Sequence, residues 1–324
     1  MNVLSLFDGI SCGRLALQRA GIPVEKYYAS EIDKYAIKVT MANFPDTIQL
    51  GDVSKIDFKQ FTGKIDMIIG GSPCQDLSIS GKRAGLKGER SGLFYKFVEA
   101  IQTIKPKYFL LENNVGMPRE AYLEMSRLMG CYPVEINSAL VSAQNRRRYY
   151  WTNIRLKQVL LFGLPHSDIP QPEDKGIILQ DVLEEGLADR IKSFAVYATD
   201  YKGNGKDTLL YATRHKVRPY KAIRLGILNN GGQAQRVYSV KSKSVTLSSN
   251  GGGQGAKTGL YRVNLPDGDY IIRRLTPVEC ERLQTLPDGY TEGISNTQRY
   301  KCLGNGWTVD VITHIFSFIQ DKEE

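Results

Sequence analysis

The sequence predicts an α/β fold in which helices cover both faces of a parallel sheet, together with a second, small β-rich and loop-rich domain. Two observations predict this class. Short apolar runs alternate with helix-like segments up to about residue 150, and strands separated by helices form parallel sheets. Beyond residue 154 the alternation fades into a segment rich in Gly, Ser, Asn, Lys and Arg, which is typical of loops on a small β scaffold.

The expected elements follow in order along the chain. Each strand is a short apolar run, and the helices end where Gly or Pro interrupts the pattern, as at Gly21, Gly130 and Pro106. The expected strands are Val3–Phe7, Lys26–Ser30, Thr47–Leu50, Ile65–Gly70 and Tyr108–Leu111. The expected helices are Arg14–Ala20, Asp33–Asn43, Gly92–Ile104 and Arg119–Met129. A helix over Pro277–Leu286, and a strand and helix within Asn305–Ile319, are expected to close the fold.

Length and cysteine content narrow the class of protein. A chain of 324 residues with 42% hydrophobic residues suits about two domains. The five cysteines are scattered without a CxxC pair, and there are only three histidines, so we expect neither a disulfide framework nor a metal site. The start of the chain lacks a basic leader and a long apolar run, so we expect no signal peptide and no membrane span. A reducing cytoplasm fits these features.

The positive charge is concentrated in one segment. The chain carries a net charge of +9, yet Tyr201–Arg262 alone holds seven Lys and five Arg against a single acid, Asp207. Such a segment favours a module that faces nucleic acid. An ordinary solvated basic surface is the alternative.

One cysteine lies where a strand is expected to end. Cys74 belongs to Gly70–Gln75, which follows the apolar run Ile65–Ile69. The two glycines are expected to let the loop turn and let a ligand approach, and Pro73 restricts the backbone before the cysteine. These features present Cys74 as a reactive thiol, whereas a buried structural cysteine is the alternative.

Polar residues also follow the first three strands. The segment Phe7–Gly13 is a turn into a helix, but Gly9 and Gly13 are its only glycines, so it does not require a phosphate. Glu31, after the second strand, could accept both hydroxyls of a ribose, and Asp52, after the third, could meet an adenine amino group. Each carboxylate could instead cap a helix. Together they predict an adenosine ligand without a pyrophosphate.

Three consecutive arginines end the segment Gln144–Arg148. If this stretch is a strand, Arg146 and Arg148 point to one face and Arg147 points to the other. A solvated arginine cluster is the alternative.

Six motifs together resemble a known family. In chain order they are Phe7-Asp8-Gly9, Ser72-Pro73-Cys74-Gln75, Glu112-Asn113, Gln144–Arg148, Arg274–Cys280 and Gly304-Asn305. The set is similar to the DNA (cytosine-5)-methyltransferases of bacteria and phages, and Glu112–Met117 and Gly304–Val309 also resemble the animal de novo enzymes. The resemblance implies a Rossmann-like, S-adenosylmethionine-dependent methyltransferase sheet in a catalytic domain over residues 1–155, a target-recognition domain over 156–271, and a return to the catalytic domain over 272–324.

The resemblance also implies a mechanism. Addition of a thiolate to carbon 6 of cytosine makes carbon 5 nucleophilic, and Cys74 would be that thiolate. Glu112 would act as an acid and hydrogen-bond acceptor at ring nitrogen 3 and the exocyclic amine. Arg146 and Arg148 would contact the base, the phosphate and Glu112.

The implied ligands are S-adenosyl-L-methionine and double-stranded DNA. The base must leave the duplex to be reached, and Ser80 would support the vacated strand. The expected cofactor contacts are Phe7, Asp8, Gly9, Ile10, Glu31, Ile32, Asp52, Val53, Pro73 and Asn305. The expected DNA contacts are Ser80, Lys82, Arg83, Arg236, Lys241, Lys243 and Lys257.

Two other functions remain open at this point. One is methylation of RNA, as in a transfer-RNA branch with similar motifs, and the other is a catalytically silent DNA-binding regulator. The presence of both Cys74 and Glu112 argues against a silent protein. We expect a monomer, with a cognate restriction nuclease as a further partner, and we expect Cys12, Cys131, Cys280 and Cys302 to be structural.

Overall fold

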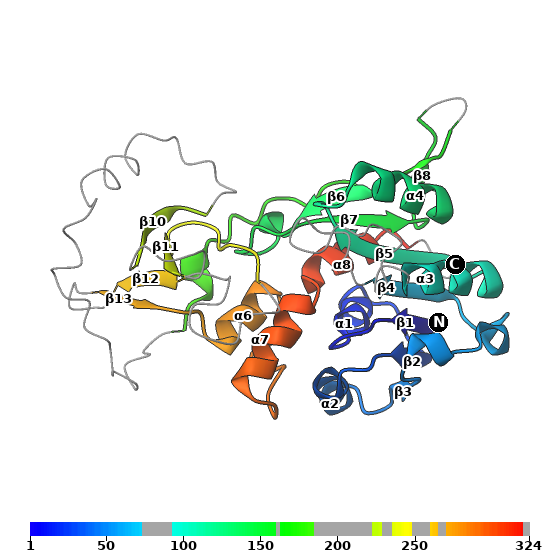
Figure 1. Ribbon diagram of the computed structural model, residues 1–324, viewed down its shortest axis with the longest axis horizontal. Coiled ribbons are helices and arrows are strands. Elements are labelled where there is room, and N and C mark those ends of the chain that lie inside the picture. Colours follow the sequence, from blue (N-terminus) through cyan, green and yellow to red (C-terminus); the bar gives the residue numbers. More distant parts are fainter. Residues whose placement is uncertain are drawn as a thin grey trace. The chain divides into compact units, whose positions relative to one another are not determined.

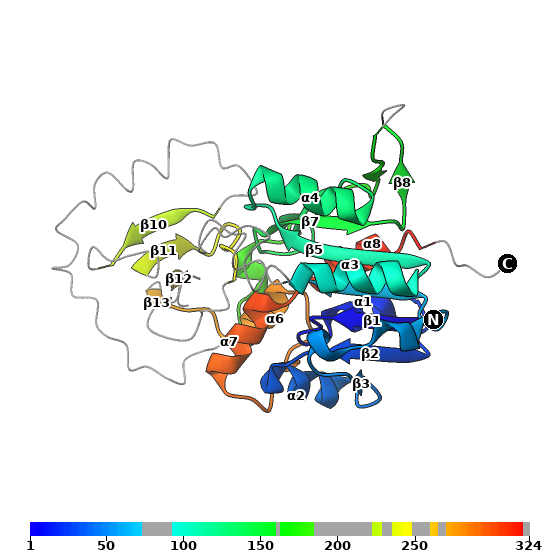
Figure 2. The same cartoon turned by 45° about the vertical axis from the view of Figure 1, so that its right-hand side comes forward.

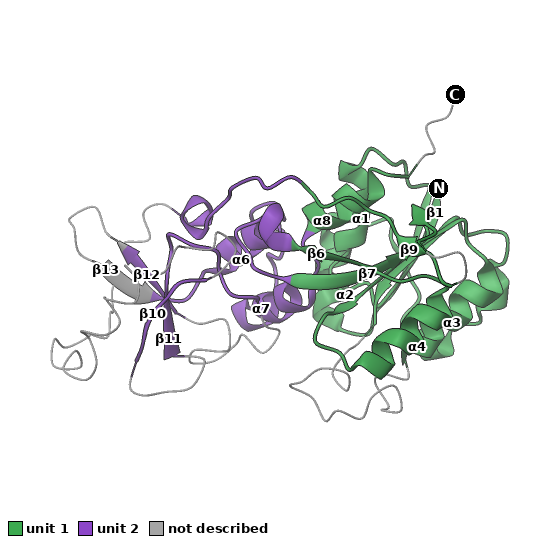
Figure 3. Cartoon of the chain, turned by 90° about the horizontal axis from the view of Figure 1, so that it is seen from above, with its two compact units in different colours: residues 1–137, 147–172, 309–324 green, residues 138–146, 173–308 purple. Residues whose placement is uncertain are grey.

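The computed structural model describes residues 1–72, 93–159, 163–184, 222–228, 235–247, 260–264 and 270–319. The chain forms two compact units (Figure 3). Unit 1 comprises residues 1–137, 147–172 and 309–324, and unit 2 comprises residues 138–146 and 173–308. These bounds follow compactness alone, and the functional division expected at residues 155 and 271 stays a prediction.

Unit 1 contains a seven-stranded sheet with the order β3-β2-β1-β4-β5-β7-β6 (Figure 1). The strands are β1 (Asn2–Leu6), β2 (Lys26–Ser30), β3 (Ile48–Gln49), β4 (Met67–Gly71), β5 (Tyr108–Asn114), β6 (Val134–Asn137) and β7 (Arg147–Thr152). The pairs from β3 to β5 are parallel, as the alternation of strands and helices predicts.

The five expected strands form the parallel part of the sheet, whereas β7 is antiparallel to both β5 and β6. Only residues 138–146 separate β6 from β7. A parallel return needs a crossover of about a dozen residues or more, whereas an antiparallel return does not. The short connection therefore reverses the strand direction.

Helices cover both faces of this sheet, so the expected fold class is confirmed. The helices of unit 1 are α1 (Cys12–Arg19), α2 (Lys34–Asn43), α3 (Leu93–Ile104), α4 (Arg119–Met129) and α8 (Val309–Phe316), with short 3₁₀ turns η1 (Val53–Lys55) and η2 (Phe58–Phe61). Helices α1 and α8 pack together on one face, and α3 and α4 lie on the other (Figure 3). Strands β8 (Leu156–Lys157) and β9 (His166–Ser167) form a separate pair that extends away from the main sheet (Figure 2).

Local chemistry explains where several of these helices begin and end. The carboxylate of Asp33 accepts a hydrogen bond from the Tyr35 amide at 2.9 Å, which caps the start of α2. Gly130 has a φ of 72° and ends α4, because a left-handed residue stops the helix. None of the helices in the described part of the chain has the length and apolarity that a membrane crossing needs.

Gly70 has a different role from the one expected. It lies within β4, and its φ is not positive, so it does not form the turn. A Cβ on Gly70 would lie 2.6 Å from the Leu6 carbonyl oxygen and 2.9 Å from the ring of Phe97. Both neighbours belong to the core beneath the strand. Gly70 is therefore required by close packing of β1, β4 and α3.

Unit 2 contains the second, smaller sheet, with the order β10-β11-β12-β13. Its strands are β10 (Arg224–Ile227), β11 (Arg236–Ser239), β12 (Leu260–Asn264) and β13 (Tyr270–Arg273). Its helices are α6 (Pro277–Leu283) and α7 (Asn296–Asn305), with 3₁₀ turns η4 (Ser138–Leu140) and η5 (Leu179–Val182). The expected β-rich part is thus present in unit 2.

Three details of the closing segment differ from expectation. Helix α6 ends at Leu283 rather than at Leu286, because Thr285 adopts a φ of 54°. Helix α7 was not expected, since its polar sequence has little helical periodicity. The expected strand is absent between α7 and α8, where three residues leave no room for one.

Candidate active site

Glu31 joins the ends of β1 and β2 at the carboxyl edge of the sheet in unit 1. One carboxylate oxygen accepts a hydrogen bond from the Gly9 amide at 2.9 Å. The other accepts from the Ile32 amide at 2.7 Å and the Asp33 amide at 2.9 Å. Because Asp33 itself caps α2, Glu31 is not needed as the cap. Three backbone donors instead fix this carboxylate beside the turn that follows β1.

The turn after β1 has an unusual backbone. Phe7, Gly9 and Ser11 have φ values of 59°, 60° and 57°, and the left-handed region is costly for Phe and Ser. At Gly9, nothing lies within 4 Å of the place where a Cβ would be. The turn therefore presents its backbone to open space beside Glu31, and such strain is common at ligand sites.

The half-buried Asp8 holds this turn through hydrogen bonds to two hydroxyl groups. Its two carboxylate oxygens accept hydrogen bonds from the Ser11 hydroxyl at 2.5 Å and the Tyr27 hydroxyl at 2.8 Å. The Ser11 hydroxyl also lies 3.0 Å from that of Thr40. Burial raises the pKa of Asp8 above its usual 3.8, and these hydroxyl donors oppose the rise. The side chain of Asp8 thus shapes the loop, although sequence reasoning placed it among the ligand contacts.

The other expected cofactor residues have varied surroundings. Ile32 is 76% exposed, which is unusual for an isoleucine, whereas Ile10 and Val53 are buried. Asp52 caps η1 by accepting hydrogen bonds from the amide and hydroxyl of Ser54 at 2.9 and 2.8 Å. The hydrogen bond from the Ser54 amide is the main cause that lowers the pKa of Asp52. Phe7 packs partly against the core of unit 1. Asn305, the last of the expected cofactor contacts, ends α7 and belongs to unit 2.

A largely buried ion pair lies at the end of β5. The Nε of Arg148 is 2.8 Å from a carboxylate oxygen of Glu112, and the two side chains are only 15% and 12% exposed. Arg148 also donates to the side-chain carbonyl of Asn114 at 3.3 Å. In the antiparallel pairing of β5 with β7, Asn114 is the partner of Arg148. The reversed strand β7 therefore brings a guanidinium to the carboxyl edge.

The end of β4 lies beside this ion pair. In the register of β4 and β5, Gly71 is the partner of Glu112. The side-chain amide of Asn113 donates to the hydroxyl of Ser72 at 3.0 Å, and both residues are buried. Asn113 thus fixes the point where the chain leaves β4. Sequence reasoning gave Asn113 no role, although a polar side chain at the end of an apolar strand was a signal for one.

Arg146 and Arg147 have partners of their own. Arg147 pairs with Glu135 on β6, away from Glu112, as strand alternation predicts. Arg146 lies just before β7, in unit 2, and is 4% exposed. Its guanidinium donates to the Gly304 carbonyl at 3.4 Å and the Gly306 carbonyl at 3.0 Å. A solvated arginine cluster is therefore not what forms here.

Lys243 contradicts its expected role as a DNA contact. It is 2% exposed, and its ammonium donates to the carbonyls of Ser142, at 3.0 Å, and Ile177. Burial lowers its pKa. By contrast, Lys241 is exposed and Arg236 is half-buried on β11. Six of the residues assigned to the site lie outside the described residues: Pro73, Cys74, Ser80, Lys82, Arg83 and Lys257.

The described cysteines and the other residue types that bind metals form no metal site in the described part of the chain. Cys12, Cys131, Cys280 and Cys302 are all buried free thiols, in keeping with a structural role. Over the described ranges, no group of three or more His, Cys, Asp or Glu side chains is arranged to hold a metal ion.

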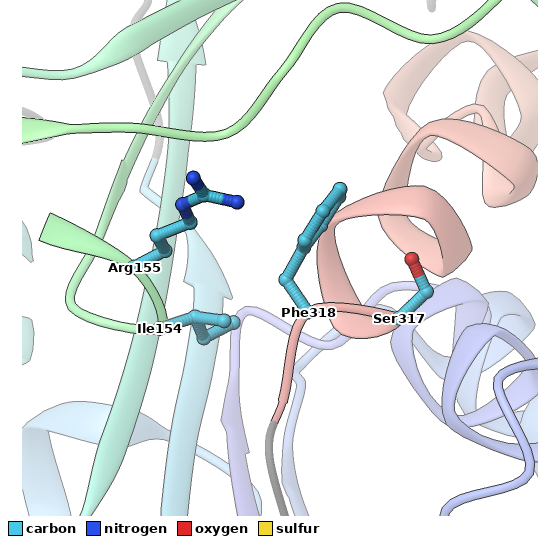
Figure 4. A pocket seen from close by; sticks show the side chains of 4 residues that line it. All are labelled: Ile154, Arg155, Ser317 and Phe318. Atoms are coloured by element: carbon cyan, nitrogen blue, oxygen red, sulfur yellow. The ribbon is translucent and has the colours of Figure 1, made fainter.

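A hollow of about 490 Å³ lies elsewhere in unit 1, lined by Ile154, Arg155, Ser317 and Phe318 (Figure 4). Ile154 and Arg155 follow the end of β7, where Thr152 pairs with Leu110 near the start of β5. The hollow is therefore at the opposite edge of the sheet from Glu112.

Comparisons with known sequences match this chain along nearly its whole length. A sequence model of the C-5 cytosine-specific DNA methylases matches residues 1–321. The type II methyltransferase M.HhaI of Haemophilus parahaemolyticus is 31% identical over 97% of this chain and 93% of its own. The orphan methyltransferase M.SPRI of Bacillus phage SPR is 28% identical over 98% and 96%.

Solved structures share the fold. The Dnmt2 methyltransferase of S. pombe superposes with a TM-score of 0.65 at 17% identity, over 98% of both chains. The methyltransferase EhMeth of Entamoeba histolytica gives a TM-score of 0.68 at 17% identity, over 100% of this chain and 99% of its own. With the match along the whole sequence, these findings show that the chain belongs to the C-5 cytosine-specific DNA methylase family and is a methyltransferase that acts on cytosine.

Proposed function

We propose that this protein transfers a methyl group from S-adenosyl-L-methionine to carbon 5 of a cytosine flipped out of duplex DNA. The observation that carries the proposal is the Glu112–Arg148 pair, 2.8 Å apart and mostly buried at the carboxyl edge of unit 1. Ser72 is fixed beside it by Asn113. Cys74 follows Ser72 by two residues, so covalent geometry limits the distance between their Cα atoms to about 7 Å.

The first two strand ends fit an adenosine-containing cofactor. Glu31 is oriented by three backbone amides, and a carboxylate with about four acceptor positions keeps one for a ribose hydroxyl. Exposed Ile32 offers an apolar surface to the adenine, and open Gly9 lets the ligand approach the backbone. Ile10 and Val53 are buried, so they would act through their backbone. The other proposed contacts are Phe7, Asp8, Asp52, Pro73 and Asn305.

The chemistry follows from the proposed pair of a thiolate and an acid. The Cys74 thiolate adds to carbon 6, and Glu112 gives a proton to ring nitrogen 3, so carbon 5 gains nucleophilic character. Arg148 keeps the Glu112 carboxyl aimed at the ring. The bound cofactor supplies the methyl group that carbon 5 accepts. A solvent water or hydroxide then takes the carbon 5 proton, the bond between sulfur and carbon 6 breaks and restores the thiolate, and ring nitrogen 3 returns its proton to Glu112.

We further propose that the protein works as a monomer on double-stranded DNA at a specific sequence, with a cognate restriction nuclease as its companion. The base must be everted because carbon 5 and carbon 6 cannot be reached within the stack. Lys241 and Arg236 in unit 2 are the described candidates for phosphate contact. Ser80, Lys82, Arg83 and Lys257 complete the proposed set.

A mechanism-based trap tests the proposal. Duplex DNA containing 5-fluorocytosine should form a stable covalent adduct, because fluorine cannot leave carbon 5 as a proton does. Mass spectrometry should locate the adduct on Cys74, and Cys74→Ala should form none while still binding DNA. An adduct on another residue would show that the nucleophile is wrong.

The same assay separates the alternative substrates. Adduct formation with duplex DNA and not with a matched RNA supports the proposal. Adduct formation with RNA alone would replace DNA by RNA as the substrate. DNA binding without any adduct or methyl transfer would identify a silent DNA-binding protein.

A further inference from the structure

Two buried glutamines, Gln144 and Gln284, contact each other in unit 2. Both are 0% exposed, and the Nε2 of Gln144 donates to the Oε1 of Gln284 at 3.2 Å. Gln144 precedes the arginines before β7, and Gln284 follows α6. The two residues are thus far apart in sequence and joined by a single hydrogen bond in the interior.

Gln284 holds the turn between α7 and α8. Its Nε2 donates to the carbonyls of Leu303 at 2.7 Å and Gly306 at 3.2 Å. Its Oε1 accepts from the hydroxyl of Thr308 at 2.9 Å as well as from Gln144. A glutamine amide has two donors and two acceptor positions, so this one is fully used. The turn it grips contains Asn305.

Gln144 holds a different segment, Lys243–Leu247. Its Oε1 accepts from the amide of Leu247 at 3.0 Å. Around it, the Asn145 amide donates to the Ser244 carbonyl at 3.1 Å, and the Ser244 amide donates to the Ala143 carbonyl at 2.7 Å. In the sequence, Lys243–Leu247 leads directly into the glycine-rich stretch 248–259 that follows it.

Gln284 and Arg146 share one hydrogen-bond acceptor. The Gly306 carbonyl that accepts from Gln284 also accepts from the guanidinium of Arg146 at 3.0 Å. This pair of hydrogen-bonded amides therefore links Lys243–Leu247, the turn around Asn305 and the carbonyl that accepts from Arg146. Buried polar networks of this kind fix a single arrangement, because any member left unpaired is costly.

We propose that Gln144 and Gln284 are positioning residues that hold Lys243–Leu247, part of the basic segment expected to face DNA, in register with Asn305 and Arg146. This inference rests on the proposed function, in which Lys241 and Arg236 of the basic segment contact DNA and Asn305 contacts the cofactor. The family resemblance adds the expectation that Arg146 contacts the base or the phosphate. Sequence recognition would then depend on two amides that touch neither DNA nor cofactor. An ordinary structural network would stabilise unit 2 without affecting recognition.

The first test measures the link itself, independently of activity. The variants are Gln284→Met and Gln144→Met, which keep length and volume, with exposed Gln180→Met as the matched control. In Gln284→Met we expect amide hydrogen exchange in residues 244–247 to rise about tenfold, together with that of residues 303–308. The control should leave both segments unchanged. A rise confined to residues 303–308 would overturn the proposal.

The second test measures recognition. Bisulfite sequencing of DNA from cells that express each variant gives the sequence context of every methylated cytosine. We expect the fraction outside the wild-type context to rise about tenfold in either glutamine variant and to stay constant in Gln180→Met. Fewer methylated sites in an unchanged context would refute the positioning role. If the wild-type protein methylates no DNA, the proposed function fails, whereas the exchange experiment still decides whether the two segments are coupled.

Discussion

At the scale of the residue, burial decides what a charged side chain can do. Lys241 and Lys243 are two positions apart in a strongly basic segment, and nothing in the local sequence distinguishes them. Lys241 is exposed, but Lys243 is 2% exposed and its ammonium is held by two backbone carbonyls. Net charge therefore overstates the number of cations available to phosphate in this segment.

Substitution of these two lysines should separate stability from DNA binding. Lys243→Met leaves two buried carbonyls without their donor and should lower the free energy of unfolding by about 2 kcal/mol. It should not change the salt dependence of DNA binding. Lys241→Met should preserve stability and reduce the slope of log K against log salt by about 1. Urea unfolding and fluorescence anisotropy check both effects, and the opposite assignment would restore Lys243 as a DNA contact.

Asp8 should make stability depend on pH in a defined direction. Because burial raises its pKa above 3.8 in the folded state, the folded protein binds more protons between that value and the raised pKa. The stability that this group contributes is greatest below pH 3.8 and is lost as the pH rises through the raised pKa. The unfolding free energy of the wild type, relative to Asp8→Asn, should therefore fall as the pH rises above 3.8.

Asp288 provides a control of opposite sign. A hydrogen bond from Arg282 lowers its pKa, so its contribution is present above pH 3.8 and is lost as the pH falls. Relative to Asp288→Asn, the wild type should lose stability on acidification, by a small amount because Asp288 is half exposed. Parallel slopes for the two variants would contradict the assignment for Asp8.

At the scale of the element, the antiparallel strand β7 is what completes the carboxyl edge. Five parallel strands bring Glu31, Glu112 and the end of β4 to this edge, but none of them carries a cation there. Strand β7 runs the other way, so its first residues meet the last residues of β5. Successive side chains of β7 point in opposite directions, so Arg148 pairs with Glu112 and Arg147 pairs with Glu135.

Two neighbouring substitutions on β7 should have unequal effects. Arg148→Met removes the partner of Glu112, and kcat for methyl transfer should fall about a hundredfold or more, the range typical of a misplaced acid. Arg147→Met, on the opposite face, should leave kcat within about twofold of the wild type. Single-turnover transfer of labelled methyl groups measures both. Equal losses would mean that the strand as a whole, rather than the ion pair, supports catalysis.

At the scale of the whole molecule, charge is divided unevenly along the chain. The segment Tyr201–Arg262 holds all of the excess positive charge. If it neutralises several phosphates, DNA affinity should fall at least about a hundredfold between 50 and 200 mM salt, because bound cations displace counterions. Anisotropy titrations with a labelled duplex measure this. A nearly constant affinity would remove the segment from the DNA interface.

The sequence was sufficient for features that depend on local pattern. The five parallel strands, the start of α2 near Asp33 and the end of α4 at Gly130 all follow from apolar runs and single-residue preferences. Features that depend on distant partners were not accessible. The reversal of β7 depends on its pairing with β5, and the burial of Lys243 depends on carbonyls at residues 142 and 177. Glu112 and its contact with Arg148 were expected from the motifs, and the direction of β7 explains how the two side chains meet.

The order in which the chain visits its two units constrains how this enzyme can be re-engineered. Residues 138–146 belong to unit 2 although they interrupt the strands of unit 1, and they pair with residues 243–247. A chimera that takes its specificity from a relative must therefore transplant two stretches, 173–308 and the nine-residue excursion before β7. A graft of the longer stretch alone would place residues 243–247 of the relative against residues 138–146 of this chain, so their hydrogen bonds would no longer match.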